Sequence, residues 1–393
     1  MRSESLAAAW NATVSTTTTP ELAPPSALNK LAAMAGVSFN GDEPWDIQVA
    51  DRRLYQRILM KGSLGFGEAY LDGWWDCERL DQLFHRLLLV DADKRIDRWM
   101  RLRLVGEILR QSLFNLQSIE RAFEVGERHY DIGNDVFETM LDSTMSYSCG
   151  YWQQAESLEQ AQRCKLDMIC RKLELQPGER LLDIGSGWGG LARFAAEHYG
   201  VEVFGITVSK EQQKMARARC CGLAVHIELM DYRKLCGKFD KIVSIGMFEH
   251  VGPKNYALFM DIVERLLPDQ GLFLVHSIGS HQTLRKLDSW TDKYVFPNGL
   301  LPSAADIAAA VEGRFLIEDW HNFGADYDRT LMAWWDNFER GWPALEAKYG
   351  ARFYRMWKYY LMSCAGFFRS RQGQLWQVVL SKRARTGVYR SVR

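Results

Sequence analysis

The chain has 393 residues, more than one domain usually contains, so we expect a main domain and a smaller second one. Its 49 basic residues equal its 49 acidic ones, so no overall positive field attracts nucleic acid, and we expect no such partner. The eight cysteines form no Cys-x-x-Cys pair, which argues against a metal site or a disulfide framework and favours a reducing, cytoplasmic location.

The N-terminal part of the chain is predicted to be helical. Residues 1–25 are poor in large apolar side chains, which predicts a disordered tail without the pattern of a signal peptide. Helical spacing over 26–116 predicts a small domain, joined by a linker at 117–128 to a catalytic domain at 129–393. Within the small domain, residues 94–116 carry five arginines among apolar side chains, a pattern that suits either anionic lipid headgroups or an ordinary surface helix. No apolar run approaches the roughly 18 residues of a membrane span, so any contact with lipid should be peripheral.

Apolar runs of strand length alternate with helical stretches from about residue 173 onward. The predicted strands are 180–184, 201–206, 224–229, 241–245 and 271–278. The predicted helices are 191–198, 209–220 and 256–267. Repeated units of this length predict an α/β fold, a parallel Rossmann-like sheet covered by helices on both faces.

A glycine-rich turn, LLDIGSGWGG (181–190), lies between the first predicted strand and the first of these helices. Gly185 and Gly187 allow a tight turn and the close approach of a ligand to the backbone. The acid that would hold a dinucleotide ribose after the next strand is missing from GITVSKEQ (205–212). Asp183 stands where a carboxylate can face the cationic end of S-adenosylmethionine, so we favour methyl transfer over hydride transfer. A tight turn that binds no ligand is the alternative reading.

Several longer motifs extend over most of the remaining chain. They are SLGFGEAYLDGWW (63–75), HYDIGN (129–134), MSYSCGYW (145–152), GMFEHVGPKNY (246–256), YVFPNG (294–299), DWHNFGADY (319–327) and LWQVV (375–379). On these motifs the chain resembles the cyclopropane fatty acid synthases and the related mycolic acid cyclopropane synthases, from about residue 27 to the C-terminus. Its helical N-terminal domain is similar to that of the bacterial branch that modifies phospholipids, which implies that this domain associates with lipid.

The resemblance implies a set of cofactor contacts in addition to the glycine-rich turn. Together with Asp183 and the turn, the residues expected to bind S-adenosylmethionine are Tyr147, Ser148, Gly185, Gly187, Gly189, Thr207, Gln212, Asp231 and Tyr232. The last two should border the adenine. This chain has Ser186 where the family usually has cysteine, and a small polar residue at that turn should not abolish binding.

The resemblance also implies a catalytic pocket for an alkene in an acyl chain. Methyl transfer to an alkene creates a carbocation-like centre, which the ring of Tyr327 can stabilise through its electron-rich face. Ring closure then needs a base, and the family is understood to hold a bicarbonate ion for this purpose. Its cage is implied to be Glu249, His276, the Tyr327 hydroxyl and the backbone near Cys149 and Ile278.

Other readings of these residues stay open at this point. Taken alone, His276 could be an ordinary histidine in a buried strand, Glu249 an exposed carboxylate at a helix start and Tyr327 part of the core. Cys364 is only a weak candidate, because methyl transfer from sulfur to an alkene needs no thiolate.

We therefore expect a methyltransferase that cyclopropanates acyl chains of phospholipids in a bilayer, at the inner face of the membrane. It is expected to be a homodimer. A methyltransferase that forms a methyl-branched lipid or acts on a small amine or hydroxyl is the first alternative, and a catalytically idle lipid- or cofactor-binding protein is the second. The preferred headgroup and double-bond position do not follow from the sequence.

Overall fold

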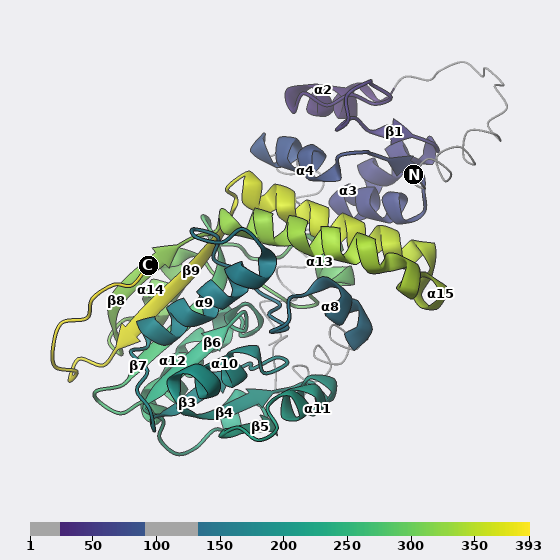
Figure 1. Ribbon diagram of the computed structural model, residues 1–393. Coiled ribbons are helices and arrows are strands. Elements are labelled where there is room, and N and C mark those ends of the chain that lie inside the picture. The colour runs from purple at the N-terminus through teal and green to yellow at the C-terminus, as the bar shows by residue number, and fades with distance from the viewer. Residues whose placement is uncertain (1–23, 91–132) are drawn as a thin grey trace.

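The computed structural model describes residues 24–90 and 133–393, and a seven-stranded sheet with helices on both faces forms its larger part (Figure 1). The strands lie in the order β5-β4-β3-β6-β7-β9-β8. Five of them are the predicted ones: β3 (Arg180–Ile184), β4 (Glu202–Thr207), β5 (Val225–Leu229), β6 (Lys241–Ile245) and β7 (Leu272–Ser280). These five pair in parallel, and the predicted α/β class is confirmed.

Helices cover the sheet in the predicted alternating order. The predicted helices are found to within one residue at each end as α10 (Gly190–Tyr199), α11 (Lys210–Arg219) and α12 (Tyr256–Leu266). On one face, α10 and α11 pack beside α9 (Leu158–Lys172) in one apolar core. On the other face, α12 and α14 (Ala304–Val311) form a second core. The strands are apolar on both sides because both cores bury them.

The sheet differs from the prediction in one respect: it is not entirely parallel. β8 (Leu316–Asn322) and β9 (Gly373–Ser381) complete it, and β9 runs antiparallel to both β7 and β8. The cause is the helical segment α15 (Asp326–Arg369) between them. Arg369, at the end of this segment, pairs with Asp328, near its start, at 2.8 Å. The segment therefore brings the chain back to the same end of the strands at which β8 finishes. A strand that starts from that end must run in the opposite direction to β8.

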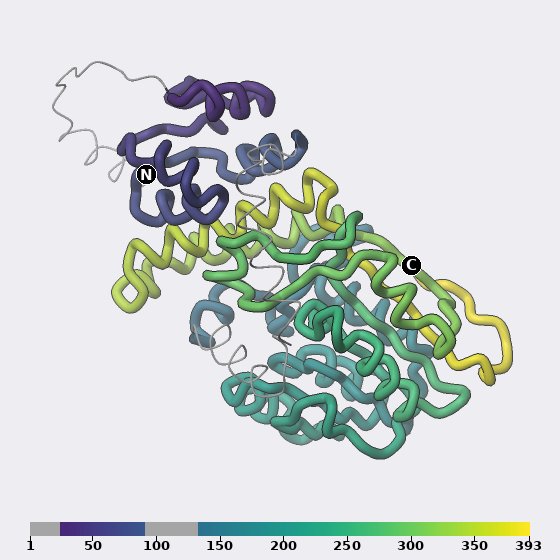
Figure 2. Tube along the Cα trace, turned by 180° about the vertical axis from the view of Figure 1, so that it is seen from behind, coloured from purple at the N-terminus to yellow at the C-terminus, as the bar shows by residue number. Residues whose placement is uncertain are grey.

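The α15 segment is a hairpin of two helices that meet at Gly350. The glycine has φ 73° and ψ 166°, a backbone conformation that residues other than glycine rarely adopt. Aromatic rings pack across the hairpin, with Phe338 against Tyr354 at 6.1 Å and Trp342 against Phe353 at 6.4 Å between centroids. The two arms lie side by side, between the sheet and the N-terminal helices (Figure 2).

The N-terminal helices are α2 (Ser26–Met34), α3 (Arg53–Leu71) and α4 (Leu80–Leu89), with a short antiparallel pair of strands, β1 (Gln48–Val49) and β2 (Trp75–Asp76). Residues 1–23 of the predicted tail, the arginine segment 94–116 and the linker 117–128 lie outside the described residues, and the division into domains stays a prediction. Within residues 24–90 and 133–393, no helix is long and apolar enough to cross a membrane.

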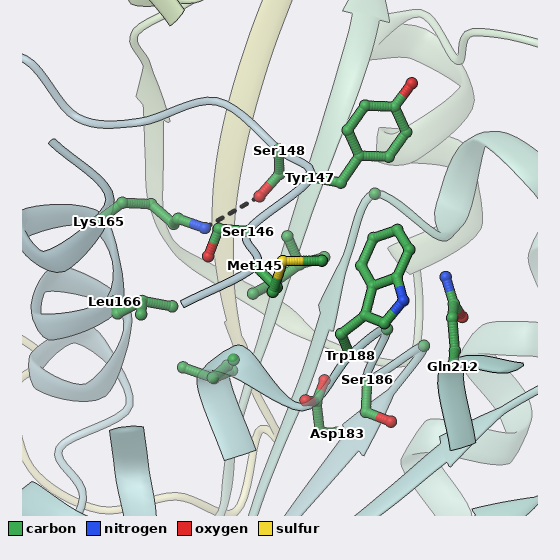
Figure 3. A pocket seen from close by; sticks show the side chains of 16 residues that line it. Met145, Ser146, Tyr147, Ser148, Lys165, Leu166, Asp183, Ser186, Trp188 and Gln212 are labelled. Carbon is green, nitrogen blue, oxygen red and sulfur yellow. Dashed lines mark hydrogen bonds between the residues drawn. The ribbon is translucent and has the colours of Figure 1, made fainter. Parts of the chain in front are cut away.

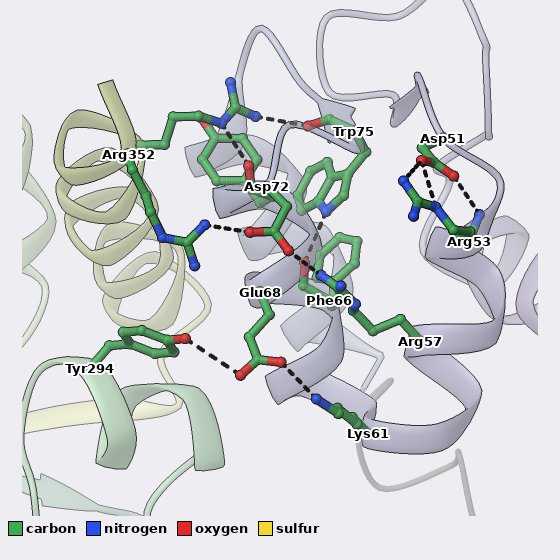
Figure 4. A network of polar contacts seen from close by, with 12 residues as sticks. Asp51, Arg53, Arg57, Lys61, Phe66, Glu68, Asp72, Trp75, Tyr294 and Arg352 are labelled. Atoms are coloured by element: carbon green, nitrogen blue, oxygen red, sulfur yellow. Dashed lines mark hydrogen bonds and ion pairs between the residues drawn. The ribbon is translucent and has the colours of Figure 1, made fainter. Parts of the chain in front are cut away.

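Ion pairs join the N-terminal helices to the rest of the chain. Asp72, which ends α3, contacts Arg57 of the same helix and Arg352 of the hairpin (Figure 4). Glu68 of α3 accepts from Lys293 at 2.6 Å, and Lys293 belongs to α13 (Ser289–Tyr294). Buried side chains of the N-terminal helices and of α15 also belong to one hydrophobic core. The N-terminal helices are therefore fixed on the hairpin by both charge and apolar contact.

α4 and the hairpin lie close together at Gly366. A Cβ atom there would lie 2.6 Å from the Cβ of Phe84 and 2.7 Å from the backbone nitrogen of His85. We expect Gly366→Ala to lower the free energy of unfolding by about 1–3 kcal/mol, because the two helices must move apart. Denaturant titration of the variant beside Ser363→Ala, a half-buried position on the same helix, measures the effect. Equal stability of the two variants would contradict the prediction.

Candidate active site

A pocket opens at the carboxyl ends of β3 and β6, where a parallel sheet of this type binds its ligands (Figure 3). One wall is the segment 145–148, another is the glycine-rich turn, and α9 contributes the side chains of Lys165 and Leu166. Of the predicted cofactor residues, six line this pocket: Tyr147, Ser148, Asp183, Gly185, Gly187 and Gln212. The structure thus brings together segments that are far apart in the sequence.

The glycine-rich turn has the geometry that its sequence predicts. Gly185 and Gly187 have φ 89° and 53°, and the amides of Gly185 and Ser186 both donate to the carbonyl of Ile206 on β4. Gly189 precedes α10 with φ 80° and lies outside the pocket lining. A Cβ there would lie 3.1 Å from the sulfur of Cys220, so Gly189 allows α10 and α11 to pack closely.

Asp183 and Lys165 are two buried ionisable side chains that line the pocket. Burial raises the pKa of Asp183 to about 7, although the Lys165 cation opposes this shift. Burial lowers the pKa of Lys165 to about 8, and its Nζ donates to Ser148 Oγ at 2.9 Å. Sequence reasoning missed Lys165. The sequence did contain a signal for it: Lys165 lies on the buried face of α9, together with Gln162 and Leu166.

The residues that follow β4 and β5 are placed differently with respect to the pocket. Thr207 Oγ1 donates to Gln212 Oε1 at 2.7 Å and so orients a side chain of the pocket wall. Asp231 caps a short turn through the amide of Arg233 at 2.9 Å, and Tyr232 packs its ring on Phe259. Asp231 and Tyr232 lie outside the lining, although they follow a strand that ends at the same edge of the sheet.

Aromatic side chains also line the pocket. Trp188, in the glycine-rich turn, lines the pocket and donates from Nε1 to Asn134 Oδ1 at 3.0 Å. Tyr147 shares a hydrogen bond of 2.6 Å with the hydroxyl of Tyr360 on the hairpin. Trp188, Met145 and Ser186 were not assigned to the site from sequence. Their positions within two motifs already assigned to the cofactor were the available signal.

Glu249 lies in a short 3-10 turn (Phe248–His250) that follows β6, and it is buried rather than exposed. Its Oε1 accepts from the amide of Ile278 on β7 at 2.7 Å. Its Oε2 is buried and has no partner among the described residues. Burial raises the pKa of Glu249 to about 7. A carboxyl group of this kind can gain or lose a proton near neutral pH.

His276 lies in β7, beside the pocket residue Gly246, whose amide donates to the His276 carbonyl at 2.9 Å. Its Nδ1 is 3.2 Å from Nε2 of Gln377, and its Nε2 has no partner within the described part of the chain. Burial and the nearby Lys165 cation lower its pKa well below the ordinary value, so the imidazole is neutral.

Tyr327 begins the hairpin and is buried against Phe368, with 4.4 Å between ring centroids. The pKa of its hydroxyl is raised well above the ordinary value, first by burial and then by the nearby groups Cys149, Tyr147, Glu249 and Cys364. Cys149, Glu249 and Cys364 of the predicted catalytic residues therefore lie near enough to Tyr327 to act on its hydroxyl. Burial also raises the pKa of Cys364 to about 12, so this thiol stays protonated at neutral pH.

Known proteins are similar to this chain over most of its length. Residues 117–378 match the family model described as mycolic acid cyclopropane synthetase. A cyclopropane-fatty-acyl-phospholipid synthase of Escherichia coli (strain K12) is 53% identical over 92% of this chain and 94% of its own length. The chain belongs to the cyclopropane synthase family. The family predicted from the motifs is thereby confirmed, and with it the predicted enzyme class, a methyltransferase that uses S-adenosylmethionine.

Two further relatives define the range of the family. A tuberculostearic acid methyltransferase of Mycobacterium tuberculosis (strain ATCC 25618 / H37Rv) is 33% identical over 81% of this chain and 78% of its own length. A solved mycolic acid cyclopropane synthase in complex with SAH and CTAB is 30% identical, covers 66% of this chain and 98% of its own, and superposes with a TM-score of 0.62. The first name describes a methyltransferase and the second a cyclopropane synthase.

Proposed function

We propose that the chain transfers a methyl group from S-adenosylmethionine to the cis double bond of an unsaturated acyl chain in a membrane phospholipid and closes it into a cyclopropane ring. The relative from Escherichia coli, whose name states this activity, supports the substrate. The observation that carries the proposal is the buried Glu249 carboxyl, which is held by the Ile278 amide through one oxygen and has a second oxygen without a partner among the described residues. Methyl transfer alone needs no such group, whereas ring closure needs a base.

The pocket beside the glycine-rich turn is the proposed site for S-adenosylmethionine, which supplies the methyl group as a sulfonium. Asp183 offers a buried carboxylate to the positive charges of this ligand, while Gly185 and Gly187 leave room for it along the backbone. Gln212, oriented by Thr207, and the side chain of Tyr147 also line the pocket.

The proposed role of Asp183 predicts a pH dependence of cofactor binding. Because its pKa is raised to about 7, the carboxyl is mostly neutral at pH 6 and mostly ionised at pH 7.5, still below the pKa of about 8 of Lys165. We expect the affinity for S-adenosylmethionine to rise roughly eightfold over this interval, as the ionised fraction does. Isothermal titration calorimetry measures it, and Asp183→Asn should bind more weakly and without this dependence. A variant that keeps the pH dependence would exclude Asp183 as its origin.

Tyr327 is the proposed stabiliser of the positive charge that develops on the acyl chain. Its ring is buried, so water does not compete for the charge, and an aromatic face attracts a cation without attacking it. The stacked ring of Phe368 fixes its orientation. Burial keeps the thiols of Cys149 and Cys364 protonated, so neither offers a thiolate that could trap the charge.

The polar groups around Glu249 fit a small anion such as bicarbonate. Glu249 Oε2 and His276 Nε2 are buried polar atoms without a partner among the described residues, which is a costly state unless a ligand satisfies them. They would hold bicarbonate together with the Tyr327 hydroxyl and the backbone near Cys149 and Ile278, and the bound ion would supply a base. The Ile278 amide already donates to Glu249. To contact bicarbonate it would either share its hydrogen between Glu249 and the ion or donate to the ion instead of Glu249.

The remaining parts of the proposal concern the setting of the enzyme. We infer that it meets its substrate at the inner face of the membrane as a peripheral protein, since the substrate lies in a bilayer. The predicted homodimer stays a prediction, which sedimentation or light scattering of the purified chain tests.

The proposed function is tested by mass spectrometry of lipids after incubation with S-adenosylmethionine and vesicles of a monounsaturated phospholipid, with and without bicarbonate. We expect a gain of one methylene with loss of the alkene signals, and a lower rate without bicarbonate. A methyl branch would keep the lipid substrate and remove ring closure. No lipid product under any condition would overturn the proposal and favour another methyl acceptor or a binding protein.

A further inference from the structure

Three polar side chains form a row across neighbouring strands next to the proposed catalytic pocket. In the pairing of β7 with β9, His276 is opposite Gln377, and in the pairing of β9 with β8, Gln377 is opposite His321. Side chains of directly paired residues lie on the same face of a sheet. Gln377 has no exposed surface, and it comes from the LWQVV motif, to which the sequence assigns no role.

The amide of Gln377 turns its nitrogen toward His276, and its oxygen has no partner among the described residues. Gln377 Nε2 lies 3.2 Å from His276 Nδ1, and an amide nitrogen is a donor only. With the amide in this orientation Nδ1 accepts, and a neutral imidazole that accepts at Nδ1 carries its hydrogen on Nε2. His276 Nε2 is the buried atom that has no partner among the described residues. The Nε2 hydrogen of His276 is therefore a buried donor without an acceptor among the described residues.

The surroundings keep His276 from taking a second proton. Lys165 and Lys172 of α9 and His321 of β8 all oppose a positive charge on this ring, in addition to its burial. Lys172 is itself buried, with its Nζ 3.0 Å from His321 Nδ1 and 3.5 Å from Asp319. Because the ring is uncharged, the position of its single hydrogen decides what it offers to a ligand.

We propose that Gln377 is a positioning residue that holds neutral His276 with its hydrogen on Nε2, so that His276 presents a hydrogen-bond donor to an anion in the catalytic pocket. This inference rests on the proposed function for the anion's purpose. The placement of the hydrogen is a property of the resting protein and can be measured without turnover. Where a histidine binds a metal ion, loss of such a partner typically changes affinity or activity by about 10–100-fold, and we expect an effect of similar size here.

Two substitutions separate this role from simple packing. Gln377→Met keeps the size of the side chain and removes the donor, so we expect a mixture of His276 tautomers and a kcat about 10–100-fold lower. In Gln377→Glu, the carboxylate accepts from Nδ1. At low pH the His276 imidazolium carries a hydrogen on both nitrogens, so Nε2 still donates. At higher pH the ring loses the Nε2 proton, because the carboxylate holds the hydrogen on Nδ1. Nε2 is then an acceptor. Activity of this variant should therefore fall as the pH rises, unlike that of the wild type, with KM for S-adenosylmethionine unchanged in both.

The experiment combines nitrogen NMR of histidine-labelled protein with rates measured from pH 6 to 8.5. The His276 signals are assigned from their loss in His276→Gln. The control is Gln374→Met, three residues earlier on the opposite face of β9, where the side chain contacts Asn322. We expect the wild type and the control to show a hydrogen on Nε2 and equal rates.

A wild-type spectrum with the hydrogen on Nδ1 would overturn the inference, whatever the activity. So would wild-type rates and pH profiles in both Gln377 variants. If the wild type forms no cyclopropane lipid, the proposed function fails, while the spectrum still reports whether Gln377 places the hydrogen.

Discussion

Cyclopropane formation should fall about 10²–10⁴-fold in Glu249→Gln, the range expected when a group that handles the proton is lost. Glutamine has the same shape and can still accept from the Ile278 amide, so the fold and the contact at 2.7 Å are retained. What is lost is a carboxyl group whose pKa of about 7 allows it to exchange a proton near neutral pH. The rate is measured by mass spectrometry of the product lipid.

The control for this variant is Glu312→Gln, which alters an exposed carboxylate just after α14. It should show the wild-type rate. Affinity for S-adenosylmethionine should be the same in all three proteins, because Glu249 does not line the cofactor pocket. A Glu249→Gln enzyme with more than a tenth of the wild-type rate would exclude a role for this carboxyl in ring closure.

The second large effect is expected at Gly190, where the glycine-rich turn enters α10. A Cβ there would lie closer than 3.0 Å to the carbonyl oxygen of Thr144. Thr144 immediately precedes the segment 145–148, which forms the opposite wall of the cofactor pocket. Because the obstacle is backbone, no change of side-chain rotamer relieves it, and Gly190→Ala must push the two walls apart. We expect the affinity for S-adenosylmethionine to fall by about 100-fold or more, since small misplacements of a site are this costly.

Calorimetric titration with S-adenosylmethionine measures this change, and circular dichroism shows whether the variant is folded. Gly222→Ala is the matched control: a Cβ there has no atom within 4 Å, although its φ of 83° is strained for alanine. It should lose some stability and no affinity. Wild-type affinity in folded Gly190→Ala would show that the turn and the segment 145–148 do not form one site.

The central strands could be predicted because each is an apolar run of strand length, buried by helices on both faces. β8 could not, since Leu316 and Ile317 are 49% and 44% exposed at the outer edge of the sheet and charged residues follow them. The direction of β9 depends on the α15 hairpin, which brings the chain back to the end of the strands at which β8 finishes. A local pattern does not reveal that two helices will fold back on each other at Gly350.

The site shows the same division between local and long-range information. The glycine-rich turn and Asp183 are adjacent in sequence, so their common location follows from one strand and one helix. Lys165 and Gln377 reach the site from α9 and β9, and only the assembled sheet shows that each contacts a predicted residue. The prediction that Glu249 and Tyr327 share one site came from family resemblance, because the two lie 78 positions apart in the sequence.

The packing of the N-terminal helices on the hairpin has a consequence for how the molecule is made. Arg369 of the hairpin binds Asp81 of α4 at 2.6 Å across 288 positions of sequence. A ribosome adds about 5–20 residues per second, so roughly 15–60 s separate the synthesis of these two side chains. During that interval α3 and α4 have been made, but the hairpin that covers their apolar side chains has not. The first described helices to be synthesised are thus among the last to be packed into a core. Until then their apolar side chains remain accessible to chaperones and to other nascent chains.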